Sequence, residues 1–151
     1  MKYCYLLCLV LAAQCLSAQQ KAVEYDEALP KSLNADDYGM KKYVFCLLKS
    51  GPAKDLPAAT VKTLFEGHMA NINSLAAQGL LSIAGPFAKN DRNYRGIYIF
   101  NVSTVEEAAA LTALDPAIKA GLLEAELTVW YGSAALQKVN ETHSKIEKTK
   151  I

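Results

Sequence analysis

Histidine and cysteine are scarce in this chain, which has two histidines and four cysteines among its 151 residues. Their spacing from each other and from acidic residues matches no zinc or iron site, so the pattern predicts no metal. A glycine-rich phosphate loop is also absent, and no cofactor is expected. The balance of 16 basic and 15 acidic residues gives no electrostatic argument for binding nucleic acid or an anionic membrane.

The first 18 residues have the composition of a secretory signal peptide. Lys2 is followed by an apolar run from Tyr3 to Leu16 and by the small residues Ser17 and Ala18. This run is shorter than the roughly 20 apolar residues of a membrane-spanning helix, so no stable membrane insertion is expected. Cleavage after Ala18 would leave an exported protein, periplasmic or secreted. Cys46 would then be its only cysteine, which excludes an intramolecular disulfide and favours a small buried side chain over a reactive thiol.

The remaining chain has the length and composition of one domain with polar ends. Residues 19–39 are predicted to be a linker or arm, residues 40–132 the folded domain, and residues 133–151 a polar tail that is either a frayed helix or disordered. His143 lies in this tail and is most simply a solvated residue.

Within the domain, hydrophobic periodicity predicts alternating strands and helices. Strands are expected at residues 41–48, 80–84, 95–102 and 123–131, with helices at 56–78 and 104–114 and a short helical turn after Asp115-Pro116. We expect Gly85-Pro86 to end the second strand, and Ser103 with Glu106 to form a capping box before the second helix. The order β-α-β-β-α-β predicts an α+β, ferredoxin-like fold, in which a four-stranded antiparallel sheet carries both helices on one face.

The first and third predicted strands are apolar on both faces. Phe45 and Leu47 lie opposite Val44 and Cys46 along one strand, although helices can cover only one side of the sheet. A second copy of the sheet is the economical cover, so the sequence predicts a homodimer packed face to face. The chain's own N-terminal arm or C-terminal tail is the alternative cover.

His68 is the histidine of the predicted domain, and it falls on the apolar stripe of the first helix. One interpretation is a neutral core histidine with a hydrogen-bond partner. The other is a general base or acid, because an imidazole exchanges protons near neutral pH. Gly67 beside it either allows close approach of another backbone or is simply tolerated in the helix.

Asp115 precedes Pro116 at a predicted helix start, where a carboxylate caps free backbone amides. Capping alone is one interpretation, and a carboxylate that also faces a site is the other. Tyr43, Tyr98 and Trp130 are expected to be core or dimer-interface aromatic residues rather than residues that stack on a ligand.

Three segments together resemble the YCII-related family. They are His68-Met-Ala-Asn-Ile72, Gly79-Leu-Leu-Ser-Ile-Ala-Gly-Pro86 and Asp115-Pro-Ala-Ile-Lys-Ala-Gly121. The family is similar in fold to muconolactone isomerase and other dimeric α/β-barrel proteins, and the resemblance covers about residues 40–132. It implies a dimeric α/β barrel, a cleft between helix and sheet, and a His–Asp pair at His68 and Asp115.

One branch of that family resembles a dehydrochlorinase of hydroxylated chloroaromatics. The resemblance therefore implies a lyase or isomerase in which His68 moves a proton on a small cyclic or aromatic ligand and Asp115 orients the imidazole. Ala117 stands where the family commonly has an aromatic residue, which leaves an enlarged cleft or a lost function open. A non-catalytic ligand-binding module and a purely structural dimer are the alternative functions.

Overall fold

The computed structural model describes residues 24–149, and the predicted signal peptide lies outside them. The described elements, in chain order, are α2 (Ala28–Ser32), β1 (Met40–Ser50), α3 (Ala58–Ala77), β2 (Leu81–Pro86), β3 (Tyr94–Phe100), α4 (Val105–Thr112), α5 (Pro116–Lys119), β4 (Leu123–Ser133), the 3-10 helix η2 (Ala134–Lys138) and α6 (Val139–Ile146). Strand order in the sheet is β2-β3-β1-β4, and every neighbouring pair is antiparallel. The ferredoxin-like α+β prediction is therefore confirmed.

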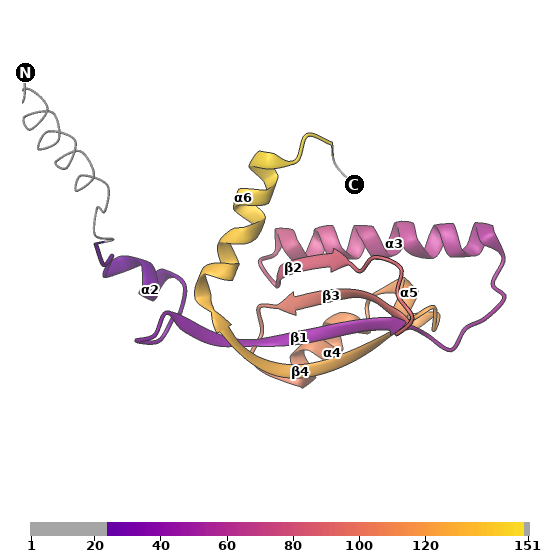
Figure 1. The fold of residues 1–151 in the computed structure, drawn as a ribbon, viewed down its shortest axis with the longest axis horizontal. Helices are drawn as coiled ribbons and strands as arrows, with labels where there is room; N and C mark the ends of the chain where they lie inside the picture. The colour runs from indigo at the N-terminus through magenta and orange to yellow at the C-terminus, as the bar shows by residue number, and fades with distance from the viewer. Residues whose placement is uncertain (1–23, 150–151) are drawn as a thin grey trace, which may run out of the picture.

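Helices α3, α4 and α5 lie on one face of the sheet (Figure 1), and this face carries the core. Val44, Cys46 and Leu48 of β1 pack with Tyr98 and Phe100 of β3 in a single buried cluster. The same cluster includes residues of α3, α4 and α5, listed here together: Leu75, Ala108 and Ala117, with the partly buried Leu64, Phe65, Ile72, Leu111 and Ile118 around them. The three helices therefore cover this face, which we call the inner face.

Helix α3 begins after Pro57, and Gly79 follows its end with a φ of +71°. A positive φ is costly for residues with a Cβ atom, so glycine ends the helix at the predicted place. Helix α4 has its capping box one residue later than predicted. The Thr104 hydroxyl accepts a hydrogen bond from the Glu107 amide, and the Glu107 carboxylate accepts one from the Thr104 amide.

Gly85-Pro86 does mark the end of the second strand, but β2 includes both residues and ends at Pro86, two residues beyond the predicted Ala84. Strand β2 is an edge strand, paired only with β3 among the described strands. A proline has no amide hydrogen to donate, and at an edge that loss costs no ladder hydrogen bond. Gly96, opposite Pro86, lies close to the backbone of Gly85, where an added Cβ would meet the Gly85 carbonyl oxygen at 2.8 Å.

Two terminal segments are more ordered than polarity alone indicates. Helix α2 lies within the predicted arm, and the Gln137 side chain donates a hydrogen bond to the Leu33 carbonyl at 2.7 Å. Helix α6 lies within the predicted tail and is attached to β2 by Asn140, whose amide donates to the Leu81 carbonyl at 2.7 Å. Among residues 24–149, no helix combines the length and the hydropathy of a membrane span.

Candidate functional site

His68 lies on the apolar stripe of α3, which faces the inner face of the sheet. The His68 residue is 8% exposed, and its ring meets the Phe65 ring edge-on at a centroid distance of 5.9 Å. Polar atoms at such a position require partners, because an unpaired buried polar group is costly.

The partner of His68 is Asp115, which lies 47 residues further along the chain. His68 Nδ1 and Asp115 Oδ2 are 2.7 Å apart, and the aspartate is fully buried. The other carboxylate oxygen, Oδ1, accepts hydrogen bonds from the amides of Ala117 at 2.9 Å and Ile118 at 3.4 Å. One oxygen caps α5 and the other holds the imidazole, so capping and pairing with His68 coexist.

Gly67 explains how two helices approach closely enough to make this pair. A Cβ at Gly67 would lie 2.9 Å from the Cγ atom of Pro116, closer than real side chains pack. The absence of a side chain on α3 therefore lets the first turn of α5 rest on the helix. Because Asp115 immediately precedes Pro116, the same contact brings its carboxylate to His68.

The environment keeps Asp115 ionised. Burial opposes ionisation, but the hydrogen bond and charge of His68 and the amides of Ala117 and Ile118 outweigh it, so the pKa of Asp115 lies below its usual value. An ionised Oδ2 accepts a proton-bearing Nδ1, which leaves Nε2 of a neutral His68 with the free lone pair. This is the tautomer in which an imidazole can take a proton from a ligand.

Tyr98 is a third polar residue of the site, and the sequence analysis missed that role. It is buried as expected, but its hydroxyl lies 3.3 Å from both ring nitrogens of His68 and 3.5 Å from Asp115 Oδ2. Burial and the Asp115 charge raise the pKa of Tyr98, so it stays a hydroxyl donor at neutral pH. The sequence contained one signal of this role. Tyr98 lies on the same face of β3 as Phe100, and that is the inner face, which His68 also contacts.

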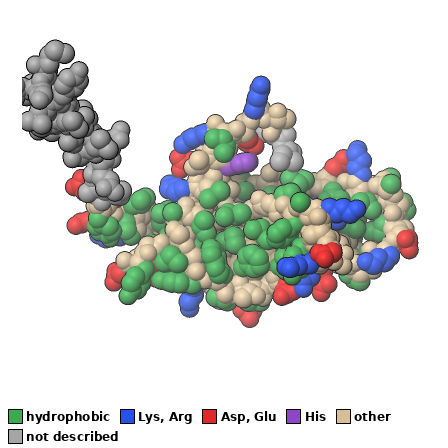
Figure 2. All heavy atoms as spheres, viewed as in Figure 1, with side chains coloured by type: hydrophobic (Ala, Val, Ile, Leu, Met, Phe, Trp, Pro, Cys, Tyr) green, Lys and Arg blue, Asp and Glu red, His purple; other side chains and the backbone are tan. Residues whose placement is uncertain are grey.

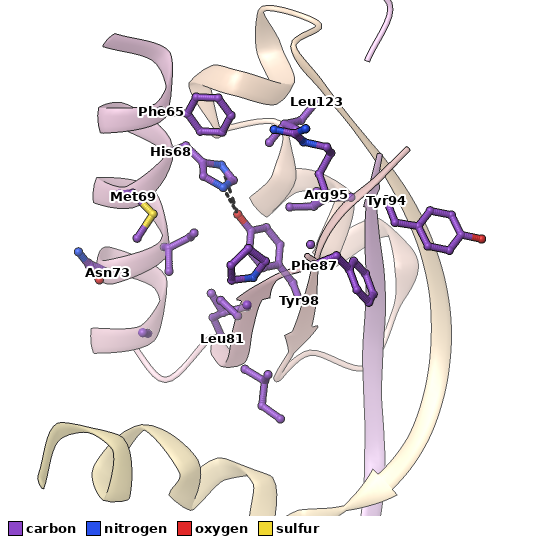
Figure 3. Close-up of a pocket in the computed structure, with 18 of the residues that line it drawn as sticks. Phe65, His68, Met69, Asn73, Leu81, Phe87, Tyr94, Arg95, Tyr98 and Leu123 are labelled. Carbon is purple, nitrogen blue, oxygen red and sulfur yellow. Dashed lines mark hydrogen bonds between the residues drawn. The ribbon is translucent and has the colours of Figure 1, made fainter. Parts of the chain in front are cut away.

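A cavity of about 1160 Å³ opens beside His68 and Tyr98. Its walls come from α3, β2, β3, the loop between β2 and β3, and α6. Figure 3 shows Phe65, His68, Tyr98 and Leu81 arranged around this space, with α6 beyond Leu81. The cavity fits the cleft between helix and sheet that the family resemblance implies.

Other residues raised by the sequence have different surroundings. Cys46 is fully buried, and burial and the Asp115 charge raise the pKa of its thiol to about 12, so it is protonated at neutral pH. Ala117 is buried in the core and is not among the residues that line the cavity, so its small side chain does not enlarge that space. His143 does line the cavity, with Nε2 3.9 Å from Glu147 Oε2.

Metal ligands do not gather at the site. Within residues 24–149, no three His, Cys, Asp or Glu side chains lie close enough together to hold a metal ion. The arrangement that the described residues do form is a buried imidazole with one carboxylate and one phenol beside an accessible cavity. Its chemistry is proton transfer and hydrogen bonding.

Fold and site together define an α+β protein of the ferredoxin-like class with a ligand-sized cavity on the helix-covered face of the sheet. The model of the YCII-related domain matches residues 43–130, and the chain belongs to that family. No curated protein matches the chain.

Among solved structures, the chain is similar to 5-chloro-2-hydroxyhydroquinone dehydrochlorinase from Burkholderia phenoliruptrix AC1100 in complex with 2,5-dihydroxybenzoquinone. The two are 19% identical with a TM-score of 0.40, over 58% of this chain and 92% of that chain.

Proposed function

We propose that this protein is a small-molecule lyase or isomerase in which His68 transfers a proton and Asp115 orients the imidazole. The observation that supports the proposal is the 2.7 Å contact between Nδ1 and Oδ2, buried at the wall of a cavity. A structural core histidine needs a partner but no cavity beside it. The predicted export of the protein remains a separate prediction, since residues 1–18 lie outside the described chain.

The proposed step begins with a cyclic ligand whose acidic C–H bond faces Nε2 of His68. The proton moves to Nε2, and the electron pair of the broken C–H bond passes into the ligand to form an enolate or expel a leaving group. The imidazolium is stabilised by ionised Asp115, and it returns the proton to another carbon in an isomerase or to solvent in a lyase. The hydroxyl of Tyr98 has either His68 or Asp115 Oδ2 as acceptor, so it keeps a partner while Nε2 is protonated.

The test measures proton transfer without requiring the natural substrate. We would incubate the protein in D₂O with a panel of cyclic ketones, lactones and phenols, including 2,5-dihydroxybenzoquinone, and follow C–H exchange by NMR. Wild type is expected to exchange at least one compound, and His68→Gln to slow that exchange by roughly 10²- to 10⁴-fold, the usual contribution of a general base. His143→Gln is the matched control, because His143 lines the same cavity without contacting Asp115.

Equal exchange rates in wild type and His68→Gln would contradict the proposal. Ligands that raise the melting temperature but show no exchange would instead support a non-catalytic binding module. Circular dichroism of each variant shows whether a lost activity reflects lost folding.

A further inference from the structure

A bulge in β3 directs Arg95 toward the cavity. Strand β1 pairs Leu48 with Gly96 and then Lys49 with Tyr94, so Arg95 is the extra residue of the irregularity. Regular alternation would place Arg95 on the same face as Ile97, the side opposite His68. A bulge can reverse the direction of a side chain. Accordingly, Arg95 lines the cavity, and Figure 3 shows its side chain extending toward the half of the cavity that His68 occupies.

The guanidinium of Arg95 has no carboxylate partner among the described residues. Lys89 is a second cation at the wall and also makes no ion pair there. The carboxylate among the lining residues is that of Glu147, which directly follows α6 and lies beside His143. Arg95 and Lys89 therefore give the cavity wall two cationic groups without ion-pair partners, and a guanidinium in this position suits an anionic group on a ligand.

Part of the cavity wall is apolar. It is formed by Ile72 and Ala76 of α3, Leu81 and Ile83 of β2, and Val139 of α6, beside the polar Asn140, His143 and Ser144 of α6. Helix α6 lies outside the matched family domain, which ends at residue 130, and Asn140 holds it against β2. Helix α6 thus adds a wall to the cavity from outside the matched domain. The volume of about 1160 Å³ slightly exceeds the usual ~300–1,000 Å³ of small-molecule sites, so a ligand larger than a single ring fits.

We propose that the cavity takes an anionic amphipathic molecule. Its carboxylate or enolate binds Arg95, its reacting carbon lies at His68, and its apolar part extends between α3 and α6. A guanidinium binds a carboxylate through two parallel hydrogen bonds, which fixes the orientation of the ligand as well as its position. The inference rests on the proposed function, because it names the substrate class of the same site.

The charge requirement is tested by calorimetric titration with 4-butylbenzoate and its neutral counterpart 4-butylbenzamide. We expect wild type to prefer the benzoate, and Arg95→Gln to weaken benzoate binding by roughly 10- to 100-fold while leaving the benzamide unchanged. Arg92→Gln is the matched control, since it removes the same charge three residues before Arg95 at a position that does not line the cavity. Equal binding of the two probes, no binding of either, or equal losses in both variants would overturn the inference.

The apolar part is tested by comparing 4-butylbenzoate with benzoate. Wild type is expected to bind 4-butylbenzoate more tightly than benzoate. In Val139→Ser this difference in affinity is expected to disappear. Ile146→Ser is the control on the same helix, because Ile146 is 74% exposed and does not line the cavity. If Val139→Ser kept the same preference for 4-butylbenzoate over benzoate, the inference that the apolar part of the ligand contacts α6 would be refuted.

Binding and proton exchange are separate measurements, so the two proposals fail separately. Selective benzoate binding that is retained in His68→Gln, with no exchange of any compound, would contradict proton transfer and support the anionic ligand. Proton exchange that depends on His68 but not on Arg95 would support proton transfer and contradict the anionic ligand.

Discussion

At the scale of single residues, Asp115 resolves two interpretations that its sequence left open. Its Oδ1 atom caps α5 and its Oδ2 atom holds His68, so one buried carboxylate both begins a helix and orients a titratable ring. The capping function was readable from Asp-Pro. The residues that complete the site, Tyr98 and Arg95, carry no motif, because their roles depend on which face of β3 each side chain occupies.

Asp115→Asn is predicted to destabilise the protein at neutral pH by about 1–3 kcal/mol, because an amide keeps the cap but loses the charged hydrogen bond to His68. The pKa of Asp115 is lowered on folding, so its contribution is present above the unfolded pKa of about 3.9 and is lost as pH falls through the lower folded value. Urea unfolding at pH 7, 5 and 3 should therefore show the difference between wild type and variant narrowing in acid. A difference that is constant with pH, or that also appears in the exposed Asp91→Asn control, would contradict this account.

At the scale of elements, local signals identified each helix and strand of the domain but misplaced some ends. Pro86 continues an edge strand because no inner neighbour needs its amide, and a single sequence does not reveal which strand is at the edge. The capping box moved by one residue because Ser103 and Thr104 are both good caps, and each has a glutamate three residues later.

That ambiguity gives a paired prediction for α4. Thr104→Ala should lower the free energy of unfolding by about 1 kcal/mol, since the Glu107 amide loses its side-chain acceptor. Ser103→Ala should change it by less than half as much, because the contact of Ser103 with Glu107 is made by its backbone amide. Thermal and urea unfolding of the two variants measure the difference. Equal effects would mean that the cap is shared.

At the scale of the whole molecule, the helices leave one face of the sheet uncovered. We call this the outer face, and it includes Phe45, Leu47 and Ile97, together with Ile99, which is buried within the chain itself. Phe45, Leu47 and Ile97 are only partly buried in the described chain. Figure 2 shows broad apolar areas in the region where Figure 1 draws the sheet. The C-terminal tail was one alternative to a second subunit as the cover of the outer face. Helix α6 of that tail lines the cavity on the α3 side instead, so in the described structure it does not cover the outer face.

The predicted homodimer is tested by sedimentation equilibrium. Wild type should have twice the chain mass, and Ile97→Lys should shift it toward monomer, because a charge buried between two apolar sheets has no partner. Leu114→Lys is the control at a residue that is 66% exposed on the loop between α4 and α5. A monomeric wild type would contradict the dimer and favour cover by the chain's own N-terminal arm.

The sequence by itself determined the ferredoxin-like order of elements, the burial of His68 and Cys46, and the helix start at Asp115. Each follows from short-range periodicity, caps and turns, which act within a few residues. Tertiary structure decided which residues of separate elements meet. Gly67 packs against Pro116, which brings Asp115 to His68, and the hydroxyl of Tyr98 lies beside both. It also decided the bulge at Arg95 and the position of α6 as a cavity wall. These contacts depend on how separate elements meet, and hydrophobic patterning within one segment does not specify the register or the face of another.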